Sequence, residues 1–236
     1  GSAWSDSLSF EFTYFNIELE KAIAALDAQV QINRCAATLD PVLCGGIGRT
    51  TGGVINRFAN QLLNIGAIKT KGWDLNIRWS LPEFSWGRFG VLWQTSHLNE
   101  FTEVTPSSSG FQETRRVGTE KGALGAAYPD WKSTLTVDWS HADWAATASA
   151  RYMSSVVDSN NLRNLSATTY VDTQVTWTPS QFMDGNWAVS VGANNLFNQD
   201  PPPCFSCALN GYDPSAYDVP GVFMYARVVA HFGRNK

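Results

Sequence analysis

Apolar and polar side chains alternate through most of the chain, and this pattern predicts β-strands. In residues 222–232, Met224, Ala226 and Val228 share one wholly apolar face, whereas Arg227 and His231 lie on the other. Successive side chains of a strand point to opposite faces, so a period of two marks a strand with one face in an apolar environment, either lipid or a protein core. Seven further segments show the same pattern: 8–15, 72–81, 89–97, 131–140, 144–153, 169–177 and 187–197.

The segment 19–34 changes period. Leu19, Ile23, Leu26 and Val30 recur every three or four residues, which predicts a short amphipathic helix in the connection after the first strand. Long connections follow the first, third, fifth and seventh strands, and short ones follow the others. This asymmetry is typical of outer-membrane barrels, which have short periplasmic turns and long outer loops, and it places the C-terminus on the periplasmic side.

Tryptophan is abundant, with ten residues, and its spacing fits a membrane. Trp131 and Trp139 are eight residues apart, as are Trp144 and Tyr152. Eight residues span about 26 Å of strand, and with a tilt of about 40° this approaches the apolar band of about 25 Å between aromatic girdles. If His141 and Ala142 form the tip of the turn, Trp139 lies opposite Trp144. The alternative is that these rings fill the core of a soluble sandwich.

Composition narrows the function classes. Seventeen Lys and Arg against 21 Asp and Glu give a net charge of −4, without the basic groove expected of a nucleic-acid-binding protein. Charged residues make up 16% of the chain, below the roughly 25% of typical soluble domains. No run of about 18 apolar residues suggests a membrane helix. His97, His141 and His231 have neither triad nor metal spacing, so we expect no enzyme, metal or cofactor.

The four cysteines fall into two local pairs, Cys35 with Cys44 and Cys204 with Cys207, within predicted outer loops. An even number of locally paired cysteines in an oxidising compartment predicts two disulfides. The Cys204–Cys207 spacing also matches a CxxC redox or zinc motif, but its Pro-rich flanks lack the helix or the further ligands that such sites need.

The face opposite the apolar one carries charges of both signs and is predicted to line the interior of a barrel. The residues assigned to this lumen are Asp74, Arg78, Asp138, Arg151, Asp172 and Arg227. Unpaired charges are costly in the narrow, dry interior of a closed eight-stranded barrel, whereas a wide lumen is wet. The pattern therefore favours a wide barrel, although an eight-stranded barrel with a packed charge network remains the alternative.

Several segments resemble the outer-membrane active transporters called TonB-dependent receptors. Residues 194–198 (Asn-Asn-Leu-Phe-Asn), Pro201-Pro202 and 217–221 (Tyr-Asp-Val-Pro-Gly) are similar to the C-terminal end of that family, and 64–75 and 12–17 are similar to earlier strand entries. The resemblance implies an all-β fold, a transmembrane antiparallel barrel of 22 strands with an internal plug and a TonB energy system. Residues 1–236 would supply the eight C-terminal strands, with a short helix in an extracellular loop.

The same resemblance implies partners that these residues do not include. We expect the plug and the remaining strands on another polypeptide or a missing segment, besides a lipid bilayer and a small solute. No export signal precedes the first strand, no TonB box is present, and residues 233–236 extend past the aromatic position where the family usually stops.

The solute is expected at the outer loops. Candidate ligand-facing residues are Phe111, Arg115, Arg116, Phe205 and Tyr212. The expected function is uptake of a scarce solute such as a siderophore, cobalamin, a nickel complex or a glycan. The alternative is a self-contained eight-stranded barrel that acts as an anchor or interaction protein.

Overall fold

The computed structural model describes residues 6–25, 28–59, 62–107, 110–121, 126–158, 162–180, 187–207 and 210–230. Its elements are β1 (Ser7–Ala25), α1 (Ala28–Thr38), α2 (Pro41–Cys44), β2 (Ile47–Arg49), β3 (Ile55–Phe58), β4 (Leu62–Ser80), β5 (Arg88–Ser107), β6 (Gly110–Arg115), β7 (Thr119–Glu120), β8 (Ala127–Tyr128), β9 (Trp131–His141), β10 (Trp144–Met153), β11 (Val156–Asp158), β12 (Asn164–Leu165), β13 (Thr168–Trp177), β14 (Trp187–Asn194) and β15 (Phe223–Ala230). Within these ranges, no helix is long and apolar enough to cross a bilayer.

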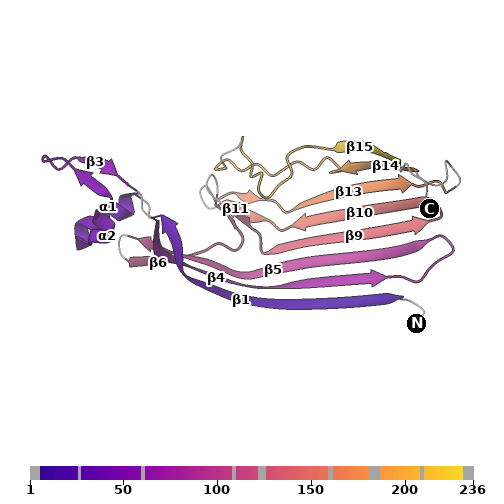
Figure 1. Ribbon diagram of the computed structural model, residues 1–236, viewed down its shortest axis with the longest axis horizontal. Helices are drawn as coiled ribbons and strands as arrows, with labels where there is room; N and C mark the ends of the chain where they lie inside the picture. Colours follow the sequence, from indigo (N-terminus) through magenta and orange to yellow (C-terminus); the bar gives the residue numbers. More distant parts are fainter. Residues whose placement is uncertain are drawn as a thin grey trace, which may run out of the picture. The chain divides into compact units, whose positions relative to one another are not determined.

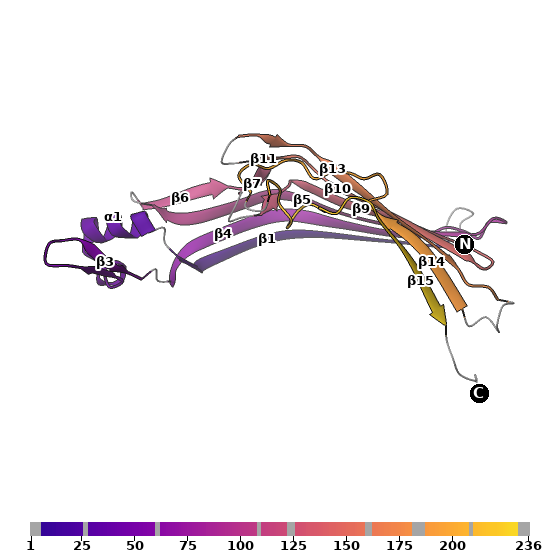
Figure 2. The ribbon, with the colours of Figure 1, turned by 90° about the horizontal axis from the view of Figure 1, so that it is seen from above.

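One large antiparallel sheet dominates the chain. Its strands follow the order β1-β4-β5-β9-β10-β13-β14-β15, and β6 pairs with β5 beside this path. Figure 1 shows β9, β10 and β13 side by side with alternating directions, and Figure 2 shows β14 next to β15 at one edge. In the described part of the chain, β1 pairs only with β4 and β15 only with β14, so the path has two free ends.

The chain forms two compact units, which we describe separately. The first comprises residues 1–14, 72–98 and 118–236, and contains most of the sheet and the loops of its C-terminal half. The second comprises residues 15–71 and 99–117, and contains the two helices, the β2–β3 hairpin and the β5–β6 hairpin.

The pairing register gives the sheet of the first unit two chemically different faces. One row across the strands joins Trp93, Leu135, Ala150 and Val171. The adjacent row joins Gln94, Thr134, Arg151 and Tyr170. Because side chains alternate along each strand, these rows extend into an apolar face and a polar face, as the alternation in the sequence predicts.

Aromatic rings gather at both ends of the apolar face. At one end, the ring of Trp73 lies 5.6 Å from that of His97 and 5.3 Å from that of Trp131, between centroids. At the other end, Trp86 and Phe89 lie 4.6 Å apart and Trp144 and Trp177 6.1 Å apart. Between these two aromatic clusters the face is aliphatic and open, with Val191 54% exposed.

The long connections of the first unit fold together. The short strands β12-β11-β7-β8 form a second sheet, in which β7 and β11 pair in parallel although they come from different connections. Its core contains Val156, Leu165, Cys204 and Tyr217, each no more than 2% exposed. We call this assembly the loop cap: β7, β8, β11, β12 and residues 204–207 and 210–217. Three separate connections therefore share one hydrophobic core.

The structure corrects three predictions made from the sequence. The helix predicted at 19–34 is wrong at its start, because β1 continues to Ala25 and α1 covers Ala28–Thr38. The long connection predicted after the third strand, between residues 97 and 131, contains three strands, β6, β7 and β8. The β9–β10 turn consists of Ala142 and Asp143, so Trp139 pairs with Ala146, and Trp144 pairs with His141. His231 and Phe232, predicted to end the last strand, lie outside the described residues.

Candidate functional site

The polar face of the sheet carries the six residues predicted to line a lumen. Asp74 accepts a hydrogen bond from the hydroxyl of Ser96, and Asp138 accepts one from the hydroxyl of Thr147. Arg78 and Arg227 are exposed. Arg151 and Asp172 contact each other directly. The assignment of this face to the lumen of a barrel stays a prediction.

Arg151 connects the sheet to the last loop. Its Nε lies 3.1 Å from a carboxylate oxygen of Asp172 on β13, and its Nη2 hydrogen-bonds Asp218, which precedes β15. The guanidinium also lies 5.4 Å from the centre of the Tyr170 ring, and the hydroxyl of Tyr170 donates to the carbonyl of Asp218. Arg151 therefore binds the end of the β14–β15 connection to the polar face of the sheet.

A cavity of about 180 Å³ lies beside Arg151, between the polar face and the loop cap. Its lining from the sheet includes Lys132, Thr134, Arg151 and Tyr170, and its lining from the loop is Ser215 and Ala216. The sequence places Lys132 and Thr134 on the polar face, but it does not indicate that residues 215–216 would cover them.

Acidic groups and a tyrosine are buried in the loop cap. Glu120 and Asp158 are fully buried and paired across the β7–β11 ladder. Burial raises the pKa of Tyr217 above its ordinary value of 10.0, and the nearby charges of Glu120 and Asp213 raise it further. The hydroxyl of Tyr217 finds no hydrogen-bond partner among the described residues. The cap therefore favours the neutral phenol.

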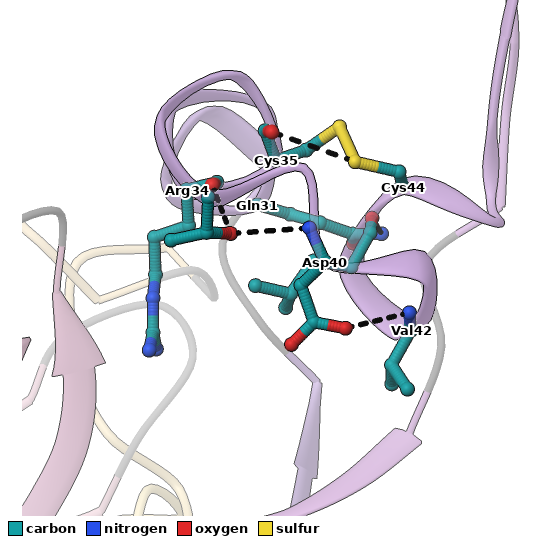
Figure 3. Close-up of a disulfide and its surroundings, with 8 residues drawn as sticks. Gln31, Arg34, Cys35, Asp40, Val42 and Cys44 are labelled. Carbon is teal, nitrogen blue, oxygen red and sulfur yellow. Dashed lines mark hydrogen bonds between the residues drawn. A yellow bond between two sulfur atoms is a disulfide. The ribbon is translucent and has the colours of Figure 1, made fainter.

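Both predicted disulfides are present, Cys35–Cys44 and Cys204–Cys207. The first joins α1 to α2, and Figure 3 shows Asp40 between them with its carboxylate accepting from the backbone N–H of Val42. This contact caps α2, whose first residue is Pro41. The amide of Gln31, 1% exposed, donates to the carbonyl of Leu43 and closes the small core of this insert. We call residues 28–59 the disulfide insert.

The predicted ligand residues of the second unit lie on or beside the β5–β6 hairpin. Phe111 is 64% exposed. Arg115 donates to the carbonyl of Asn99, and Arg116 pairs at 2.8 Å with Glu103, a half-buried contact. Both arginines therefore have structural contacts within their own hairpin, which the sequence pattern did not reveal.

The predicted ligand residues of the first unit belong to the loop cap. Phe205, 65% exposed, stands between the bonded Cys204 and Cys207. The guanidinium of Arg163 lies 4.5 Å from the centre of its ring. Tyr212 is half-buried. Sequence reasoning missed Arg163, because nothing in the local pattern connects the β11–β12 turn to residue 205. Contact of any of these residues with a solute stays a prediction.

Metal ligation has no support within the described ranges: His, Cys, Asp and Glu side chains do not gather there in threes suited to an ion.

Comparison with known proteins identifies the fold family. The family model described as TonB dependent receptor-like, beta-barrel, matches residues 1–196. Among solved structures, the outer membrane transporter YddB from Escherichia coli is similar, with a TM-score of 0.60 and 12% sequence identity. The match covers 95% of this chain and 30% of the transporter chain, so this chain spans under a third of that protein's length. No curated protein matches. The chain belongs to the TonB-dependent receptor β-barrel family.

Proposed function

We propose that this chain supplies the wall and outer loops of an outer-membrane receptor that actively imports a scarce solute. Membership of the TonB-dependent receptor family and the similarity to an outer membrane transporter support this function. The solute belongs to the classes of metal chelate, cobalamin or glycan. It binds at the outer loops and passes when the inner-membrane energy system displaces the plug.

The two-faced sheet is the observation that carries the proposal. Its apolar face leaves large aliphatic side chains in the open, among them Met224 at 73% and Val228 at 61% exposure. Such an extended apolar surface needs an apolar environment, and aromatic clusters at both ends match the two interfaces of a bilayer. The polar face then borders a water-filled lumen, where charged side chains stay hydrated.

The connection lengths support an orientation. The β9–β10 turn has two residues, whereas the loop cap is built from long connections at the other ends of the strands. In outer-membrane barrels the short turns are periplasmic, so the loop cap faces outward. The last strand then runs toward the periplasm.

The free ends of the sheet indicate what completes the receptor. The exposed backbone groups of β1 and β15 cannot remain unpaired in lipid. We propose that further strands of the same receptor pair with both, and that the enclosed space holds the plug. A closed eight-stranded barrel would instead join β1 to β15, and the described strand order contains no such pairing.

Native purification tests this architecture. The chain is isolated from outer membranes in mild detergent, and what travels with it is identified by mass spectrometry and semi-native electrophoresis. Co-purification with plug and further strands, covalently attached or not, supports the receptor. A heat-modifiable species of this chain alone would show the self-contained barrel.

Transport is tested in cells. Uptake of labelled ferric chelates, cobalamin and oligosaccharides is compared between cells with and without the receptor, each with and without a proton-motive force. Receptor-dependent uptake that disappears when the force is dissipated supports active import. Uptake unaffected by the force would point to passive diffusion.

A further inference from the structure

We propose that the cavity beside Arg151 is a binding subsite for a compact oxyanion, the carboxylate or phosphate group of a small solute. The inference rests on the proposed function for its biological setting, since the cavity opens on the face assigned to the lumen. The chemistry of the proposed subsite rests on the structure: several hydrogen-bond donors without partners line the cavity, and no carboxylate does.

The size of the cavity limits what enters. At about 180 Å³ it is smaller than the 300–1,000 Å³ of pockets that enclose a whole drug-sized ligand. A single carboxylate or phosphate group fits, with the rest of the solute left in the lumen. The walls are formed by β9, β10 and β13 of the sheet and by Ser215 and Ala216 of the loop cap.

Three donors lining the cavity have capacity to spare. Lys132 is exposed, and its ammonium forms no hydrogen bond or ion pair with any described residue; the hydroxyl of Thr134, two residues along the same face, is likewise unengaged. Arg151 uses its Nε and one N–H of Nη2 on the two aspartates, so further N–H groups of its guanidinium remain. The ammonium and the guanidinium form charge-assisted hydrogen bonds with oxyanions, which are about twice as strong as neutral ones, and the hydroxyl adds one neutral donor.

Three further hydroxyls of the lining are already committed, and Ser133 and Tyr152 occupy strand positions whose side chains belong to the opposite face of the sheet. Thr168 donates to the carbonyl of Ser166, Tyr170 to that of Asp218, and Ser215 to the carboxylate of Asp213. They shape the cavity and do not supply free donors. Selectivity for an anion therefore comes from Lys132, Thr134 and Arg151.

The charges around the cavity nearly cancel, so an oxyanion would be bound by direct hydrogen bonds and not by long-range attraction. Asp172 and Asp218 offset the charges of Arg151 and Lys132, so the region has no large net charge to attract anions from a distance. Both carboxylates bind Arg151 from outside the cavity lining. An entering oxyanion meets donors directly and competes with Asp218 for Arg151.

Protection of Lys132 from acetylation tests the subsite. The receptor in outer-membrane vesicles is treated with an acetylating reagent in citrate, inorganic phosphate, chloride or neutral glucose at constant ionic strength, and acetylation is read peptide by peptide. We expect citrate or phosphate to slow acetylation of Lys132 in a saturable way, by about fivefold at about four times its Kd. Lys71, paired with Glu100 at 2.8 Å, is the internal control and keeps its rate.

A matched pair of variants makes the test specific. Thr134→Val removes one free donor without changing the size of the side chain, and we expect it to weaken the protection of Lys132 about tenfold, equivalent to about 1.4 kcal/mol. Thr147→Val, on the same face but outside this cavity, leaves the protection unchanged.

Other outcomes overturn the subsite. They are equal slowing by chloride, which indicates screening, no slowing by either oxyanion, or equal effects of the two variants. The assay requires no transport, so a failure here leaves the proposed import function standing. Conversely, if the receptor binds oxyanions at this subsite but imports no solute, only the proposed import function is refuted.

Discussion

Gly192 shows how one missing side chain shapes the C-terminal strands. Gly192 pairs with Gln174 on one side and Tyr225 on the other, and the hydroxyl of Tyr225 donates to the amide oxygen of Gln174, 3.0 Å away. The phenol crosses directly over Gly192, because a Cβ there would come within 2.5 Å of the ring and 2.9 Å of the carbonyl of Thr173. Only glycine leaves room for this contact across three strands.

We therefore expect Gly192→Ala to destabilise the sheet by about 1–3 kcal/mol, the usual cost of overpacking. The measurement is the urea midpoint of unfolding in detergent, followed by tryptophan fluorescence. Gly90→Ala is the matched control, since a Cβ at Gly90 would meet the Cβ of Asp138 at 3.9 Å, an ordinary van der Waals contact. Equal midpoints for the two variants would show that the Tyr225 crossing contributes nothing.

The raised pKa of Tyr217 predicts that the loop cap loses stability at alkaline pH. The folded state raises the pKa of this phenol above 10.0. Above pH 10 the unfolded chain therefore releases the phenolic proton while the folded cap retains it. The stability of the cap is complete below that pH and falls as pH rises, by at most about 1.4 kcal/mol per pH unit from this group.

Tyr217→Phe removes the hydroxyl and its ionisable proton. As the pH rises above 10, we therefore expect the loop cap of the variant to lose less stability than the native loop cap. Proteolysis of the loop cap across this pH range measures the difference. The two proteins share every other ionisable group, so the native chain is the reference. Parallel pH profiles would contradict the role of Tyr217.

The charged residues show what alternation reveals and what it omits. Period two correctly placed Asp138, Arg151 and Asp172 on one face of the sheet, because side-chain direction is a local property of a strand. It gave no sign that Arg151 would bind Asp218, 67 residues later in an aperiodic loop. Partners across such distances depend on how the loop folds, so they required the structure.

The disulfide insert carries a prediction at the level of an element. The Cys35–Cys44 bond closes a short loop of nine residues' separation around α1 and α2, whose core is small. Chain-entropy arguments assign such a bond about 2–3 kcal/mol. We expect Cys35→Ser with Cys44→Ser to speed trypsin cleavage at Arg34 and Arg49.

Limited proteolysis followed by mass spectrometry gives the rates. The control is the pair Cys204→Ser and Cys207→Ser, which removes the other disulfide and is expected to leave cleavage at Arg34 and Arg49 unchanged. An unaltered cleavage rate at Arg34 and Arg49 in the Cys35→Ser, Cys44→Ser variant would mean that the disulfide insert stays folded without its disulfide.

The element boundaries that the sequence missed have local physical causes. Leu19 and Ile23 are four residues apart, a spacing that is compatible both with one face of a helix and with alternate positions of a strand, and β1 takes the second. The β9–β10 turn places Ala142 at a φ of 48°, a conformation that alanine rarely signals. Strands β6, β7 and β8 are two to six residues long and too short to show a period.

The free sheet edges carry a prediction for the whole molecule. Amides of β1 and β15 that point away from β4 and β14 have no ladder partner in the described chain. We expect hydrogen exchange at these amides to be fast in the isolated chain and slow in the complete receptor. The central strands β9 and β10, paired on both sides, serve as the internal reference. Fast exchange at both edges in the complete receptor would contradict closure by further strands.

The common core of the loop cap limits how its three connections can change independently of one another. Val156, Leu165, Cys204 and Tyr217 come from two connections and pack together with Ala127 of a third. If one of these connections is replaced by that of a relative, its core side chains no longer fit those of the other two connections. We therefore expect these connections to tolerate change either at exposed tips such as Phe205, or when all three are exchanged together.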